Sequence, residues 1–189
     1  MIDLAREMST GNAAQVEWVV DDMTTFTIDT QVDMAICMFD GIDVLLTDRD
    51  LEHHLDRVAR HLVDGGLYLV DCTHPRDCSI THYGDYTYRG ERDGVEVEIV
   101  WGTNNPRIDP VTGIAEVGTR MIVDDHGDHH VIDDVARERC FTAQELRLLV
   151  EKSGAFRIAE WYGDFTNDQP LDNSPQSKRM IALLRRNPV

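Results

Sequence analysis

The sequence predicts an α/β domain, in which a three-layer arrangement of helices around a mainly parallel sheet carries an antiparallel β insertion. Two observations support this class. Residues 32–39 and 67–70 are almost continuously apolar, which is typical of parallel strands covered on both faces. Residues 83–139 instead alternate between polar and apolar side chains, which is typical of antiparallel hairpins with one face in solvent.

The length of 189 residues fits a single domain. We expect residues 1–71 and 140–189 to form its α/β core and residues 72–139 to form the insertion. The sequence contains no internal repeat that would indicate a solenoid or an array.

The first elements are a helix and a short strand. Apolar residues at helical spacing predict a helix over residues 1–8. Residues 16–20 then predict a strand, which ends at the acidic pair Asp21 and Asp22.

A strand–helix–strand unit follows. Residues 32–39 predict the first strand, and Thr47 has the side chain and the position of a helix N-cap. The helix presents one apolar face and is expected to end near Gly65, in the left-handed conformation that glycine favours. Because residues 67–70 form the next strand after short links, the two strands are expected to be parallel with a right-handed crossover.

Turn residues divide the insertion into hairpins. They are Asp93-Gly94, residues 109–113 and His126-Gly127. The run from Asp124 to His130 is rich in metal-ligating side chains, but its place between two alternating segments favours a hairpin tip over a metal site.

The last part of the chain returns to the α/β pattern. Thr142 and Glu145 have the spacing of a full capping box, and Gly154 is expected to end the helix that they start. Two strands follow, over residues 156–161 and 180–184.

Composition excludes several classes of partner. A net charge of −17 argues against nucleic acid, because phosphates would be repelled. No apolar run approaches the roughly 18–20 residues that cross a membrane, so no membrane partner is expected. Asp3, Arg6 and Glu7 exclude a secretory signal. We therefore expect a cytoplasmic protein.

The cysteines point to free thiols. The four residues Cys37, Cys72, Cys78 and Cys140 have no C-x-x-C spacing, so neither a zinc site nor a redox pair of that type is indicated. We expect no metal in this protein.

Candidate site residues follow from the expected sheet. Ligands of open parallel sheets bind beyond the carboxyl ends of the strands, where residues 21–22, 39–40 and 71–74 would meet, with the insertion as a lid. His74 has a suitable reference pKa for a general base, or it is a surface histidine before a proline turn. Tyr83 and Trp101 are candidates for substrate contacts; strand packing is the alternative role for such aromatic residues.

Three stretches, residues 16–23, 33–40 and 61–71, resemble the class I S-adenosylmethionine-dependent methyltransferases in their order and spacing. Residues 140–146 and 153–156 are similar to the last helix and strand of that family. The antiparallel segment before the last helix resembles that of the small-molecule N-methyltransferases.

This resemblance implies a Rossmann-like methyltransferase sheet, S-adenosylmethionine as cofactor, and methyl transfer to a nitrogen or oxygen nucleophile of a small molecule. It implies that the acidic pair meets the cofactor, with Asp22 at the adenine amine, and that Met23 flanks the adenine ring. Residues Cys37, Met38 and Phe39 would run past the methionyl part. His74 is similar in placement to a base that some sugar N-methyltransferases use.

The sequence departs from the family at its start. The family begins with a strand, a glycine-rich turn and a second strand, which are not found before residue 16. We therefore expect an N-terminally truncated sheet, with residues 32–38 as an exposed edge. Activity would then need the missing half or a partner chain. The partner could be a second copy of this chain, in a homodimer formed through this edge or through the insertion. The alternative function is a non-catalytic interaction module that does not bind the cofactor.

Overall fold

A computed structural model describes residues 2–9, 16–78, 83, 86–166 and 168–188. Its helices and strands are α1 (Ile2–Met8), β1 (Val32–Cys37), α2 (Asp48–His61), β2 (Leu62–Thr73), β3 (Tyr86–Arg92), β4 (Val95–Trp101), β5 (Ile114–Asp125), β6 (Asp128–Arg139), α3 (Ala143–Ser153), β7 (Phe156–Tyr162) and β8 (Arg179–Arg186). Two short 3-10 helices, η1 (Gly41–Val44) and η2 (Pro75–Asp77), follow the ends of β1 and β2.

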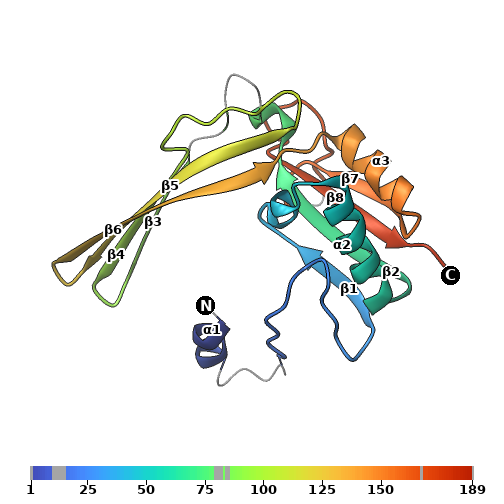
Figure 1. The fold of residues 1–189 in the computed structure, drawn as a ribbon, viewed down its shortest axis with the longest axis horizontal. Helices are drawn as coiled ribbons and strands as arrows, with labels where there is room; N and C mark the ends of the chain where they lie inside the picture. The colour runs from blue at the N-terminus through green and yellow to red at the C-terminus, as the bar shows by residue number, and fades with distance from the viewer. Residues whose placement is uncertain (1, 10–15, 79–82, 84–85, 167, 189) are drawn as a thin grey trace.

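The strands form two separate sheets of four (Figure 1). In the first, the order is β1-β2-β8-β7, with β1 parallel to β2 and β8 antiparallel to both of its neighbours. The second sheet, β3-β4-β5-β6, is antiparallel throughout and extends away from the first as a long arm. The predicted α/β class and the parallel strand–helix–strand unit are confirmed.

The expectation of three layers is wrong for the described residues. Helices α2 and α3 lie on the same face of the first sheet, where they contact each other, and α1 stands apart from the sheet (Figure 1). The described part of the core therefore has one helical layer on one sheet. A third layer would need a helix on the opposite face, and no described helix packs there.

The core lies between the first sheet and its two helices. Leu51 and Leu55 from α2 and Leu146 from α3 are each 1% exposed and belong to one buried cluster with residues of β2 and β8. Burial of a leucine side chain contributes roughly 1.5–3 kcal/mol, so this helical layer supplies much of the stability of the sheet.

Helix α2 begins as predicted but ends earlier. The Thr47 hydroxyl accepts a hydrogen bond from the backbone N–H of Asp50 at 3.2 Å, as an N-cap does. The helix ends at His61 because Leu62 is already extended and belongs to β2. Gly65 does adopt a left-handed φ of 73°, but within the strand rather than at the end of the helix.

The expected strand over residues 16–20 is absent. These residues have no regular secondary structure, and Val16, Val19 and Val20 are 50%, 44% and 78% exposed. A strand is stable only when its backbone pairs with another strand, and no described strand pairs with β1 on the side away from β2. Strand-like residues alone therefore do not produce a strand here.

The hairpin turns and the last helix follow the predictions closely. Asp93-Gly94 and His126-Gly127 have positive φ angles at both positions, which is the conformation of a tight two-residue hairpin turn. At the start of α3, the Thr142 hydroxyl accepts from the backbone of Glu145 at 3.1 Å. The capping box is only half formed, because the Glu145 carboxylate instead accepts from Arg139 at 2.6 Å.

Among the residues that the structure describes, no helix is long and apolar enough to cross a membrane.

Candidate functional site

A cleft of about 460 Å³ opens where the carboxyl ends of β1 and β2 meet the base of the arm. Its aromatic lining comes from the loop after β1, from a residue before β3 and from the arm, and consists of Phe39, Tyr83, Tyr86, Tyr88 and Trp101. Its charged lining consists of Asp40, Glu138 and Arg179. The cleft thus brings together Phe39, Tyr83 and Trp101, three residues that the sequence predicted for the site.

The loop after β1 has an unusual backbone. Phe39 and Asp40 have φ angles of 53° and 63°, in the left-handed region that residues with a Cβ rarely adopt. The Asp71 carboxylate accepts from the Phe39 N–H at 2.8 Å, and the Asp71 carbonyl accepts from the Asp40 N–H at 3.1 Å. Two consecutive strained residues persist because β2 holds them, and such strain is typical of ligand sites.

An ion network fixes the same loop from the side of β8. Arg179 donates from Nε to Asp71 at 2.7 Å and from a terminal nitrogen to Asp40 at 2.9 Å. Thr73 donates its hydroxyl hydrogen bond to the same Asp40 oxygen at 2.8 Å. Hydrogen bonds and attraction from the two carboxylates raise the pKa of Arg179 despite its partial burial, so the guanidinium is charged.

On the arm side of the cleft, the Tyr83 hydroxyl donates a hydrogen bond to the Glu138 carboxylate. Tyr83 is 6% exposed, and Glu138 is half-buried near the end of β6. Burial raises the pKa of Glu138, and the hydrogen bond from Tyr83 opposes that rise. The protonated form of Glu138 is therefore more favoured than that of an exposed glutamate.

A second acid, Asp43, is buried behind the loop. It lies in η1, is 3% exposed, and its Oδ1 atom has no hydrogen-bond partner among the described residues. Burial raises its pKa to about 9, and the neighbouring Asp40 adds to the effect. Asp43 is consequently protonated and neutral at pH 7.

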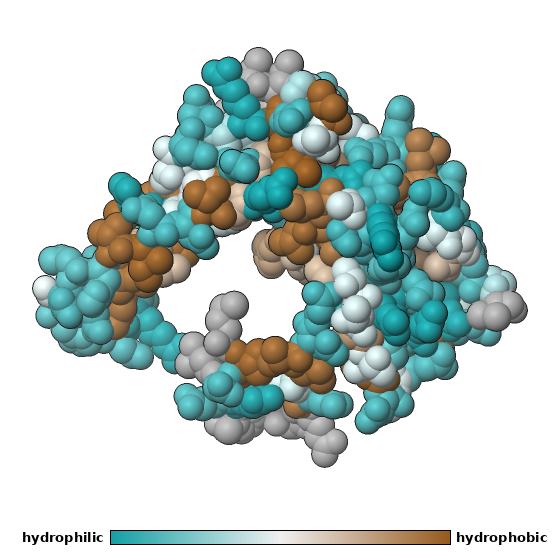
Figure 2. Space-filling view, in the orientation of Figure 1, coloured by the Kyte–Doolittle hydropathy of each residue, from teal (hydrophilic) through white to brown (hydrophobic). Residues whose placement is uncertain are grey.

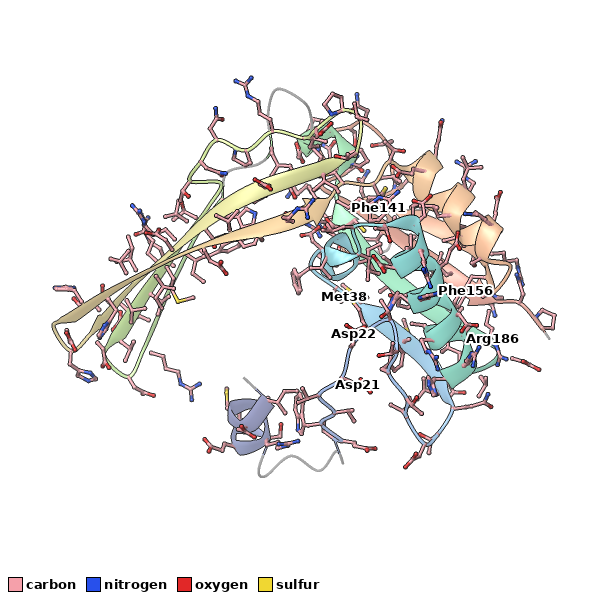
Figure 3. The ribbon with its side chains drawn as sticks, in the orientation of Figure 1. Asp21, Asp22, Met38, Phe141, Phe156 and Arg186 are labelled. Carbon is pink, nitrogen blue, oxygen red and sulfur yellow. The ribbon has the colours of Figure 1, made fainter. Side chains whose placement is uncertain are left out.

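The predicted adenine-binding residues lie on the irregular segment before β1 (Figure 3). Asp21 and Asp22 are exposed, and Asp22 accepts from both the N–H and the hydroxyl of Thr24. The hydrogen bonds from Thr24 lower the pKa of Asp22, so its carboxylate is ionised. Met23 is half-buried against the core.

A buried histidine anchors this segment to the core. The Met23 carbonyl accepts a hydrogen bond from Nδ1 of His54 at 2.8 Å, and Nε2 of His54 lies 2.7 Å from the Tyr68 hydroxyl. Because a carbonyl only accepts, Nδ1 carries the proton and Nε2 accepts from Tyr68. Burial lowers the pKa of His54, which favours this neutral form.

The residues predicted for the methionyl part lie at the carboxyl end of β1. Cys37 and Met38 are half-buried, and burial raises the pKa of the Cys37 thiol. Phe39 is 77% exposed, and its ring centroid lies 6.1 Å from that of Phe165. Figure 3 labels Met38 just beyond the β1 arrow.

Both ring nitrogens of His74 form hydrogen bonds with backbone groups. Its Nδ1 accepts from the backbone N–H of Arg76 at 3.1 Å, which caps η2, and its Nε2 lies 2.9 Å from the Asp172 carbonyl. His74 is 6% exposed and is not among the residues that line the cleft. The prediction that it acts as a base stays a prediction, and the cleft presents Glu138 as another candidate.

Sequence reasoning missed Asp43, Glu138 and Arg179. Glu138 lies in an alternating segment, and alternation does not tell which face meets the cleft. Arg179 lies one residue before the predicted last strand. Its guanidinium contacts Asp71, which lies 108 positions earlier in the chain. Only the tertiary fold joins them.

The run from Asp124 to His130 forms the predicted hairpin tip. Its histidines pair singly with neighbouring carboxylates, as His126 does with Asp125 at 2.7 Å. The described residues contain no group of three or more potential ligands that is placed to hold a metal ion.

No protein-family model matches the chain, and neither does any curated protein. Solved structures do. A methyltransferase dependent on S-adenosylmethionine from Clostridium acetobutylicum ATCC 824 has a TM-score of 0.77 and 16% identity, over 98% of this chain and 71% of that chain. The CcbJ methyltransferase from Streptomyces caelestis has a TM-score of 0.72 and 17% identity, over 99% of this chain and 71% of that chain.

The sugar N-methyltransferase KedS8 from Streptoalloteichus sp ATCC 53650 has a TM-score of 0.64 and 16% identity, over 89% of this chain and 61% of that chain. The protein therefore has the fold of the S-adenosylmethionine-dependent methyltransferases. It corresponds to only part of the length of these structures.

Proposed function

We propose that this protein takes part in methyl transfer from S-adenosylmethionine to a nitrogen or oxygen nucleophile of a small molecule. The observation that carries the proposal is the cleft at the carboxyl ends of β1 and β2, where a sheet of this kind binds ligands. Proteins that share the fold include a sugar N-methyltransferase.

Part of a cofactor site fits the described residues. Asp22 is an exposed, ionised carboxylate that is able to accept from the adenine amine, and Met23 offers a thioether to the adenine ring. The exposed Phe39 ring, held by the strained loop, fits the methionyl end. When bound, S-adenosylmethionine supplies an electrophilic methyl group on a sulfonium.

The rest of the cofactor site would come from further polypeptide. Strand β1 is the edge of its sheet, and its apolar residues Met34 and Ile36 are 46% and 64% exposed. Figure 2 shows hydrophobic surface on the arm and on the core, facing one another across an open space. An unpaired apolar edge favours pairing with another strand, so we propose that a missing sheet half or a partner chain completes the site, a second copy of this chain included.

The chain's own residues would bind and orient the acceptor and receive its proton. Tyr83 and Trp101 are the substrate contacts in this proposal, and both line the cleft together with Glu138. Two residues are candidates for the base. His74 is the candidate from the sequence, and Glu138 is the candidate from the cleft, because it lines it and burial raises its pKa.

Isothermal titration with S-adenosylmethionine tests the cofactor. We expect heat from binding, which Phe39→Ala weakens and Val111→Ala, at a 90% exposed loop residue outside the cleft, does not. No heat at millimolar concentration would exclude cofactor binding by this chain alone. Once an acceptor is known, loss of turnover in His74→Gln rather than Glu138→Gln would assign the base to His74.

The second candidate function is a non-catalytic interaction module, which the exposed β1 edge favours. Sedimentation velocity separates the two. A concentration-dependent dimer without cofactor binding supports the module. A monomer that binds S-adenosylmethionine argues against it.

A further inference from the structure

The aromatic wall of the cleft is built by the pairing of two strands. Tyr86 of β3 lies directly opposite Trp101 of β4 in the antiparallel register. Tyr88 is two residues further along β3, so it projects from the same face of the sheet as Tyr86. All three line the cleft, and Tyr86 and Tyr88 are 42% and 60% exposed, so their rings remain available to a ligand.

Exposed aromatic rings gathered on one wall attract cations. The face of each ring carries partial negative charge, and a cation within about 6 Å of it gains roughly 0.5–2 kcal/mol. Phe39 contributes a further exposed ring from the opposite, core side of the cleft. A neutral apolar ligand would also fit rings of this kind. The charged side chains of the lining therefore determine whether a cation or a neutral ligand is favoured.

The cleft lining has more carboxylates than cationic side chains. Asp40 and Glu138 are the carboxylates of the lining, and Arg179 is its one cationic side chain in the described residues. The charge of Arg179 is already shared between Asp71 and Asp40. Among the residues that the structure describes, Glu138 forms no ion pair, and its carboxylate accepts a hydrogen bond from the Tyr83 hydroxyl.

We propose that this cleft is a binding site for a small organic ammonium ion, whose charge is neutralised by Glu138 and Asp40 and whose alkyl groups lie against Tyr86, Tyr88 and Trp101. That this ion is also the methyl acceptor rests on the proposed function. Binding of the ion does not rest on it, since the site uses no residue predicted for the adenine.

Choline and its neutral isostere 3,3-dimethylbutan-1-ol are the probes, because they share their shape and differ in charge. Each is titrated into the full chain by calorimetry without S-adenosylmethionine. We expect choline to bind at least tenfold more tightly than the isostere. Equal affinity, or no binding of choline at tens of millimolar, would overturn the proposal.

Variants locate the site. Glu138→Gln and Trp101→Leu are each expected to weaken choline binding about fivefold or more. Glu96→Gln, a change of the same charge on the same sheet but outside the cleft, is expected to leave it unchanged. Circular dichroism shows whether each variant folds, and the comparison of the two probes on the parent chain needs no variant. Equal weakening by all three substitutions would contradict a localised site.

The outcomes separate this proposal from the proposed function. Binding of choline without heat from S-adenosylmethionine would support the cation site and contradict cofactor binding by this chain. Binding of S-adenosylmethionine with equal affinity for the two probes would contradict the cation site alone.

Discussion

The Arg179 guanidinium donates from Nε to the Asp71 carboxylate at 2.7 Å. This contact joins β8 to β2 at the residue that also holds the strained loop after β1. Asp71 is fully buried, and Arg179 neutralises it. We expect Arg179→Ala to lower the free energy of unfolding by about 3–5 kcal/mol, because it leaves the buried Asp71 carboxylate without its positively charged partner. Urea denaturation measures the change.

Arg137→Ala is the control for that substitution. Arg137 lies on the arm with its side chain 56% exposed, 3.9 Å from Glu116. An exposed pair of this kind contributes little, so the unfolding midpoint should stay close to that of the parent. Equal losses in both variants would show that Arg179 has no special part in holding the loop.

Asp43 makes the stability depend on pH. Its pKa is raised from 3.8 to about 9 in the folded protein, so between these values the folded chain holds one proton more than the unfolded chain. The contribution of this residue to stability is complete below pH 3.8 and is lost as the pH rises toward 9. Urea denaturation from pH 5 to 8 should therefore show Asp43→Asn gaining stability relative to the parent as the pH rises. Parallel curves would contradict the buried, protonated acid.

His54 acts in the opposite direction. Burial lowers its pKa below 6.5, so below pH 6.5 the unfolded chain takes up a proton that the folded chain resists. Stability is expected to fall as the pH drops from 6.5 toward the lowered value, and His54→Asn should lack this component. Because His54 anchors Met23, the variant should also loosen residues 21–26, which amide hydrogen exchange detects. His53→Asn, at the exposed neighbouring position, should do neither.

Gly154 ends α3 with a φ of 68°. An alanine there would hold a Cβ in the left-handed conformation, so Gly154→Ala should cost about 1–2 kcal/mol. Gly90→Ala is the control, because its φ is not in that region and nothing lies within 4 Å of the added Cβ. Thermal unfolding compares the two, and a loss at Gly90 as large as that at Gly154 would rule out the conformational cause.

Local patterns of the sequence predicted those elements that local physics determines. The N-caps at Thr47 and Thr142 and the tight turn at His126-Gly127 each depend on residues within four positions of one another. The strand over residues 16–20 failed because its pairing depends on a neighbour, not on its own residues. Strand propensity cannot supply that partner.

The site shows the same division. Phe39 and Tyr83 were found because each follows or starts a recognisable element. Arg179 and Glu138 reach the cleft through contacts across 108 and 55 positions, which no spacing in the sequence reveals. A buried acid such as Asp43 is even harder to predict from the sequence, because an aspartate after a strand is usually solvated.

The ladder between β5 and β6 runs without a break from Ile114, opposite Arg139, to Asp125, opposite Asp128. Twelve residues of strand span about 40 Å at the usual rise of about 3.3 Å per residue. Glu138 lies at one end of this ladder and the His126-Gly127 turn at the other. Because the turn and Glu138 lie at opposite ends of the ladder, any rotation of the arm about its base that changed the width of the cleft would displace the turn by a much larger distance. A fluorophore at the turn and another on the core would measure such a displacement.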